Sequence, residues 1–132
     1  MDTDEEFERA LYADAGRAYV PGVATMTEAE LSARVQAMVD ERGLWGWCFY
    51  DWRRRSAPGW PDWVIGGSGG LLLRELKSVH GTVSPEQRTA ATIFHRSGLD
   101  FAVWRPAQLG DGTIARELDT IMAAAAAPEP ST

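Results

Sequence analysis

Lysine, cysteine and long apolar runs are all scarce in this chain. One of its 13 basic residues is a lysine, Lys77, and the remaining positive charge is carried by arginine. The single cysteine, Cys48, excludes an internal disulfide and a cysteine-rich zinc site, and we expect it to be a small core residue on a strand. No apolar run approaches the roughly 20 residues of a membrane span, and four of residues 2–6 are acidic where a secretory signal is basic. These absences predict a soluble intracellular protein with no membrane partner.

The chain of 132 residues is long enough for one domain with its own core and too short for two. We divide it into an acidic N-terminal arm over 1–23, a domain over 24–123 and a flexible tail over 124–132. The net charge is -6, but residues 24–123 hold twelve acids against eleven bases, so the domain itself is nearly neutral. The acidic total is therefore only weak evidence against a nucleic-acid partner, which usually requires a basic surface.

Three segments have helical patterns. Residues 27–43 carry apolar side chains at helical spacing, open with the capping box Thr27-x-x-Glu30 and end at a glycine. Residues 84–98 open with serine as N-cap, proline at the first helical position and glutamine at the box position. Apolar residues over 114–122 mark a final short helix.

Four segments between these helices are typical of strands. An aromatic stretch over 47–52 predicts the first. The segments 62–65 and 71–78, separated by the glycine-rich loop 66–70, predict an antiparallel hairpin, and residues 100–105 predict the last strand. The predicted order is α-β-β-β-α-β-α.

Acidic residues and the lone lysine gather at the open end of this hairpin. Side chains alternate along a strand, so Glu75 and Lys77 share one face, and the hairpin brings Asp62 to them. Burial of a lone charge costs several kcal/mol unless the charge is paired or bound to metal. Mg²⁺ is commonly held by one or two carboxylates with waters and phosphate, so Asp62 and Glu75 form a candidate metal site at which Lys77 could orient a water. The alternatives are a protective surface ion pair on an edge strand, and a turn-forming role for Asp62 after Pro61.

Other candidate residues flank this constellation. Gln87 supports the site, completes its capping box, or does both. Trp60 and Trp63 either stack on bases or belong to the core. A polar stretch before Asp62 either grips phosphates or forms a solvated loop; it consists of Arg53, Arg54, Arg55 and Ser56.

Four motifs together resemble a known family. They are Gly59-Trp60-Pro61-Asp62, Glu75-Leu76-Lys77-Ser78, Ser84-Pro85-Glu86-Gln87 and Phe101-Ala102-Val103-Trp104-Arg105. Over about residues 27–109 the chain is similar to the VRR-NUC branch of the PD-(D/E)XK nuclease superfamily, especially its small stand-alone phage members. The resemblance implies an α/β fold of the restriction-endonuclease type, with a mixed central sheet flanked by helices. It also implies a metal-dependent endonuclease that hydrolyses DNA with Mg²⁺ or Mn²⁺.

The resemblance assigns roles residue by residue. Asp62, Glu75, the backbone carbonyl of Leu76 and a glutamate of the first helix would bind the metal, while Lys77 assists the water and Gln87 supports the site. For the helix acid, the family pattern of an acid directly before an apolar residue favours Glu30. Glu28 stays open as the alternative because it lies on the apolar stripe of the helix, and Glu30 could simply be a cap.

Family relatives act in replication, recombination or repair, and some resolve branched junctions as homodimers. The resemblance thus implies a DNA partner, a homodimer and selectivity for branched or junction DNA, in the cytoplasm of a bacterial or phage-infected cell. The alternative function is a non-catalytic module of the same fold that binds nucleic acid or a protein partner.

Overall fold

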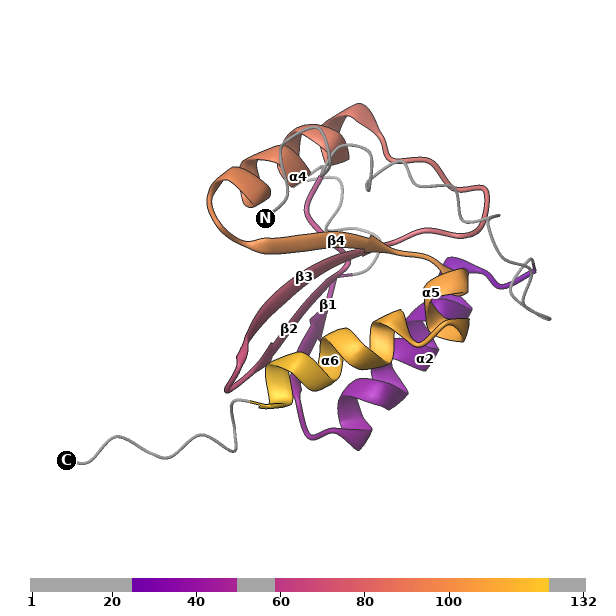
Figure 1. Ribbon diagram of the computed structural model, residues 1–132. Helices are drawn as coiled ribbons and strands as arrows, with labels where there is room; N and C mark the ends of the chain where they lie inside the picture. Colours follow the sequence, from indigo (N-terminus) through magenta and orange to yellow (C-terminus); the bar gives the residue numbers. More distant parts are fainter. Residues whose placement is uncertain (1–24, 50–58, 124–132) are drawn as a thin grey trace.

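The computed structural model describes residues 25–49 and 59–123, which form a mixed α/β structure (Figure 1). The described part has the order α-β-β-β-α-β-α-α, one helix more than predicted. With the labels of Figure 1, its elements are α2 (Glu28–Glu41), β1 (Trp45–Cys48), β2 (Trp63–Gly67), β3 (Gly70–Leu76), α4 (Pro85–Arg96), β4 (Asp100–Trp104), α5 (Pro106–Gly110) and α6 (Thr113–Ala123).

The four described strands form one mixed sheet in the order β1-β2-β3-β4. β1 pairs with β2 and β2 with β3 in antiparallel fashion, with Trp63 opposite Arg74. β3 and β4 are parallel, with Glu75 opposite Val103. A parallel pair needs a crossover connection, and α4 supplies it. This arrangement puts β3 in the interior of the sheet.

Helices cover both faces of the sheet (Figure 1). On one face Leu72 and Leu76 pack into a core with α2 and α6. On the other face Leu73 packs with Ala91 of α4. The alternation predicted for this strand is confirmed, because odd-numbered residues of β3 face α4. Glu75 therefore lies on the α4 face.

The predicted starts of α2 and α4 are confirmed by complete capping boxes. In α2 the Thr27 hydroxyl accepts a hydrogen bond from the Glu30 amide at 3.1 Å, and the Glu30 carboxylate accepts one from the Thr27 amide at 3.1 Å. Ser84 and Gln87 make the same reciprocal pair at the start of α4. Among the helices of the described segments, none is long and apolar enough to cross a membrane.

The predicted five-residue loop 66–70 is wrong in length. Only Ser68 and Gly69 form the turn, and the other glycines extend the strands. The reason is the close approach of α6: the Gly69 amide donates a hydrogen bond to the Ile121 carbonyl at 2.7 Å. A Cβ on Gly67 or Gly69 would lie 2.7 or 2.6 Å from that same oxygen, so both positions require glycine.

Other element bounds also differ from the prediction. β1 begins at Trp45, two residues early, and the predicted strand beyond Phe49 lies outside the described residues. Cys48 ends β1 and is half-buried against the α2 core. β3 and β4 stop short of the predicted ends. The missed helix α5 starts after one intervening residue, at Pro106, whose fixed φ suits a first helical position.

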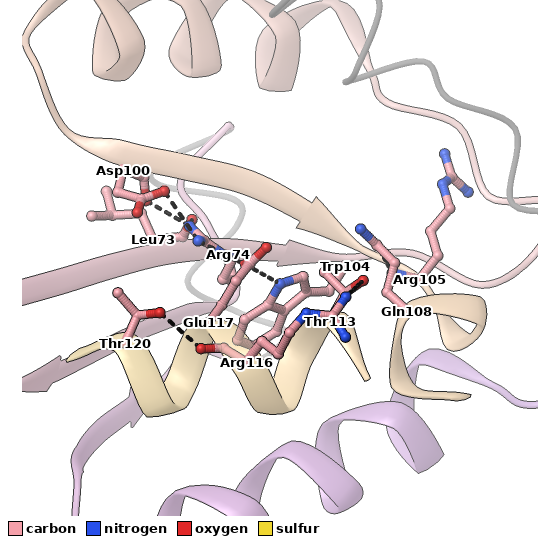
Figure 2. A network of polar contacts seen from close by, with 10 residues as sticks. All are labelled: Leu73, Arg74, Asp100, Trp104, Arg105, Gln108, Thr113, Arg116, Glu117 and Thr120. Carbon is pink, nitrogen blue, oxygen red and sulfur yellow. Dashed lines mark hydrogen bonds and ion pairs between the residues drawn. The ribbon is translucent and has the colours of Figure 1, made fainter. Parts of the chain in front are cut away.

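A buried arginine ties β3 to β4 and α6 (Figure 2). Arg74 is 2 % exposed, and its Nε and Nη2 donate to Glu117 Oε1 at 3.1 and 2.9 Å. Nη2 also donates to Asp100 Oδ1 at 3.0 Å, while Nη1 donates to the carbonyls of Leu73 and Asp100. The guanidinium lies 5.2 Å from the Trp104 ring centroid, and the Trp104 indole donates to the same Glu117 oxygen at 2.8 Å. This network satisfies a charge that would otherwise be costly to bury.

Candidate active site

Asp62 is buried directly before β2 and is held from both neighbouring strands. Asp62 is only 4 % exposed, and its Oδ2 atom accepts a hydrogen bond from the Leu76 amide at 2.8 Å. Its carbonyl accepts one from the Phe49 amide at 2.6 Å. The predicted approach of Asp62 to the end of β3 is confirmed. A turn-forming role alone does not explain a carboxylate that reaches across to β3.

Glu75 and Lys77 form a buried ion pair. Glu75 is 1 % exposed and Lys77 is 8 % exposed, and Lys77 Nζ lies 3.5 Å from Glu75 Oε2. The Lys77 amide donates to the Trp104 carbonyl at 3.1 Å, so the main chain stays attached to β4 beyond the end of β3. The alternative of a surface pair on an edge strand is excluded, because β3 lies between β2 and β4 and both side chains are buried.

One amide links the start of α4 to Glu75. Gln87 Oε1 accepts from the Ser84 amide at 3.0 Å, which closes the capping box. Gln87 Nε2 donates to Glu75 Oε2 at 2.6 Å. Gln87 therefore completes its capping box and also contacts Glu75. The cap fixes the amide, and the amide in turn fixes the Glu75 carboxylate.

Replacing Ser84 with alanine is expected to destabilise the protein by about 1 kcal/mol, the usual cost of a lost N-cap. The Ser84 hydroxyl accepts from the Gln87 amide at 3.1 Å, and that acceptor would be lost. Urea unfolding measures the change. Thr89→Ala is the matched control, because it also removes a hydroxyl from α4, one that only donates to the Pro85 carbonyl of the same helix. Equal losses in the two variants would contradict the role of the cap.

The two acids of α2 have different surroundings. Glu30 is exposed, and the hydrogen bond from the Thr27 backbone amide, with a second from its side chain, lowers the pKa of the Glu30 carboxyl. Its described contacts are those of a helix cap. Glu28 is half-buried and lines a hollow of about 410 Å³ together with Ser78 and His80. Glu28, the alternative left open by the sequence, is thus the acid beside the segment that follows Lys77.

Arg105 is a residue of this region to which the sequence analysis gave no role. Its Nη1 donates to the carbonyls of Ser78 and Gly81 at 2.8 and 2.7 Å and so braces the loop after Lys77. Gly81 lies against the lysine, since a Cβ there would be 3.4 Å from Lys77 Cδ. The one sign in the sequence that Arg105 could belong to this region was its position at the end of the predicted strand 100–105.

The remaining candidates separate into three groups. Trp63 is a core residue, 1 % exposed, whose indole donates to Ser32 Oγ at 3.0 Å. Trp60 is 40 % exposed and stays a candidate for binding. The predicted phosphate-gripping residues lie outside the described residues; these are Arg53, Arg54, Arg55 and Ser56.

The oxygen donors at this site fit a hard divalent cation. Two buried carboxylates, Asp62 and Glu75, flank the main chain of Leu76. Within residues 25–49 and 59–123, no group of three or more His, Cys, Asp or Glu side chains is placed to hold a metal ion. A pair of carboxylates is the kind of oxygen-donor set that Mg²⁺ prefers, because Mg²⁺ is usually held by one or two carboxylates with waters and substrate phosphate.

Comparisons with models of protein families, with curated proteins and with solved structures find no match to this chain. Its function is therefore inferred from the arrangement of Asp62, Glu75, Lys77 and Gln87.

Proposed function

We propose that this chain is a metal-dependent endonuclease that hydrolyses phosphodiester bonds in DNA, with the restriction-endonuclease-like core of the VRR-NUC branch. The observation that carries the proposal is the environment of Glu75. This buried carboxylate accepts a hydrogen bond from Gln87 at 2.6 Å and lies 3.5 Å from Lys77, while Asp62 binds the amide of the next residue. The order of elements and the helices on both sheet faces agree with such a core.

The cation would be held by Asp62 and Glu75, with the Leu76 carbonyl as a third oxygen donor. When bound, Mg²⁺ or Mn²⁺ supplies Lewis-acid chemistry, because it lowers the pKa of water and offsets negative charge on phosphate. Of the two acids of α2, Glu28 is the better candidate for a supporting role, since it lines the hollow beside Ser78 and His80 whereas Glu30 is already used as a cap. Within the described residues, neither acid forms a three-acid group with Asp62 and Glu75.

Lys77 would act on the water and on the phosphate. An ammonium carries three hydrogen-bond donors and no acceptor, so beyond Glu75 it can orient the attacking water and stabilise charge that develops on a phosphate oxygen. Its burial keeps this charge in a medium where electrostatic interactions are stronger than in water. Gln87 is a positioning residue, because it acts through Glu75.

The test compares the full chain with Asp62→Ala on linear, flapped and four-way-junction DNA, each with Mg²⁺, with Mn²⁺ and with chelator. We expect the parent to cut only with metal and the variant to be slower by at least about 100-fold, the usual loss when one charge-stabilising group is removed. Asp119→Ala is the matched control, because it removes an exposed carboxylate that pairs with Arg42. It should cut like the parent.

Two results would contradict the proposal. Parent-like cutting by both Asp62→Ala and Lys77→Ala would exclude this site as the catalytic centre. Binding without cleavage on every substrate would favour the non-catalytic module. Circular dichroism of each variant shows that a loss of cutting is not a loss of fold.

A further inference from the structure

A row of aromatic side chains lies on the sheet face opposite α2. β1 is an edge strand, and Trp45, Trp47 and Phe49 are spaced two residues apart, so they point the same way. A Cβ on Gly46, between them, would lie 2.9 Å from Val39 Cγ1 in the α2 core. The aromatic side chains therefore face the other side, the side on which α4 lies. We call Trp45, Trp47, Phe49 and Trp60 the aromatic stripe.

The rings of the aromatic stripe contact one another in sequence. Trp45 and Trp47 meet edge to face with centroids 6.1 Å apart, and Trp47 stacks on Phe49 at 5.5 Å with an interplanar angle of 10°. Phe49 meets Trp60 edge to face at 5.7 Å. The three tryptophans are nevertheless 54, 48 and 40 % exposed. Contiguous exposed apolar surfaces are typical of binding sites.

The aromatic stripe leads to the carboxylates. The Phe49 amide donates to the Asp62 carbonyl at 2.6 Å, so one end of the stripe adjoins the candidate active site. Trp63 packs on the α2 side, and alternation therefore sets Asp62 toward the α4 face, which also carries Glu75. At a rise of about 3.3 Å per residue, Trp45 lies about 13 Å from Phe49 along the strand.

The sequence that follows Phe49 has a composition that suits phosphate. The stripe itself has no acidic residue, and the nine residues that connect Phe49 to Gly59 in the sequence hold three arginines, Arg53, Arg54 and Arg55, against one acid, Asp51. Aromatic side chains bind unpaired bases by stacking, and arginines pair with the backbone phosphates. In a duplex the faces of the bases are already stacked, so only a single strand offers both features.

We propose that the aromatic stripe binds unpaired bases of single-stranded DNA and guides the strand to Asp62 and Glu75. This inference rests on the proposed function and gives it a substrate class, DNA with a single-stranded segment such as a flap.

The test measures binding of labelled dT12 and of a 12-base-pair duplex by fluorescence anisotropy, at low salt and with chelator. Trp45→Ala/Trp47→Ala is expected to weaken dT12 binding by at least about tenfold, since each stacked base contributes strongly to affinity. Duplex binding should change by less than about twofold. Trp45→Phe/Trp47→Phe keeps flat rings and should restore most of the dT12 affinity. Ile93→Ala is the control, because Ile93 is 57 % exposed on α4 and outside the stripe.

Several outcomes would overturn the proposal. One is unchanged dT12 affinity in a folded alanine variant, and another is no dT12 binding by the parent. A loss of self-association in sedimentation with unchanged dT12 affinity would instead assign the stripe to contact between copies of this chain. If the parent cuts no DNA but its dT12 affinity depends on the two tryptophans, the nuclease proposal fails, and the proposal that the stripe binds single-stranded DNA is supported. If the parent and Trp45→Ala/Trp47→Ala cut flapped DNA equally and bind dT12 equally, the stripe proposal fails and the nuclease proposal is supported.

Discussion

Glu75→Gln is expected to remove metal-dependent cleavage while it leaves the fold in place. Glutamine has the shape of glutamate and still offers an oxygen to Gln87 Nε2, which lies 2.6 Å from Glu75 Oε2 in the parent. The charge that would attract a divalent cation is lost, and Lys77 loses its partner at 3.5 Å. Because one charge-stabilising group typically contributes a factor of about 10²–10³, the rate should fall by at least about 100-fold.

Thermal unfolding supplies a readout that does not depend on cleavage. A ligand that binds only the folded state stabilises it, by about 2.7 kcal/mol at a concentration roughly 100 times its Kd. Mg²⁺ or Mn²⁺ should therefore raise the Tm of the parent and leave that of Glu75→Gln nearly unchanged. Glu86→Gln is the matched control, because Glu86 is an exposed acid in the first turn of the same helix as Gln87. A Glu75→Gln protein that cuts like the parent would show that Glu75 does not hold the cation.

Glu117→Ala is expected to destabilise the protein by about 3 kcal/mol, whereas Asp100→Ala should cost less than about 1 kcal/mol. Both carboxylates pair with the buried Arg74, but Asp100 is 62 % exposed and Glu117 is 34 % exposed. Glu117 Oε1 accepts from Arg74 Nε, from Arg74 Nη2 and from the Trp104 indole, so its removal leaves three donors without that acceptor. The backbone carbonyl of residue 100 would still accept from Arg74 in the Asp100 variant.

Urea unfolding of the two variants measures this difference, with the m value as a check that the unfolding transition is still two-state. The comparison is internally matched, because each change removes one carboxylate from the same guanidinium. Equal costs for Glu117→Ala and Asp100→Ala would contradict the assignment of Glu117 as the principal partner. A Glu117→Gln variant, which keeps an acceptor oxygen, should fall between the alanine variant and the parent.

Features that depend on neighbours in the sequence could be predicted. The starts of α2 and α4 follow from Thr27 with Glu30 and from Ser84 with Gln87, because capping is an interaction over three residues. The shared face of Glu75 with Lys77 follows from strand alternation, and the hairpin places Asp62 beside them.

Features that depend on distant segments could not be predicted in this way. The short turn at Ser68 and Gly69 exists because Ile121 of α6, more than fifty residues further along the chain, lies against it. Likewise, the residues near Arg74 in the sequence do not indicate that Glu117 is its partner.

The sequence by itself determined the order of the main elements and the candidate trio Asp62, Glu75 and Lys77, since local periodicity and turn chemistry define both. Only the tertiary structure decided that Gln87 serves the cap and Glu75 at once, because that contact joins α4 to β3. It also decided that Trp63 lies in the core while Trp60 is exposed. In the same way it decided that Glu30 caps its helix while Glu28 lies beside the loop after Lys77. The physical reason is that burial depends on packing between elements, and a pattern along one element does not specify which neighbour covers it.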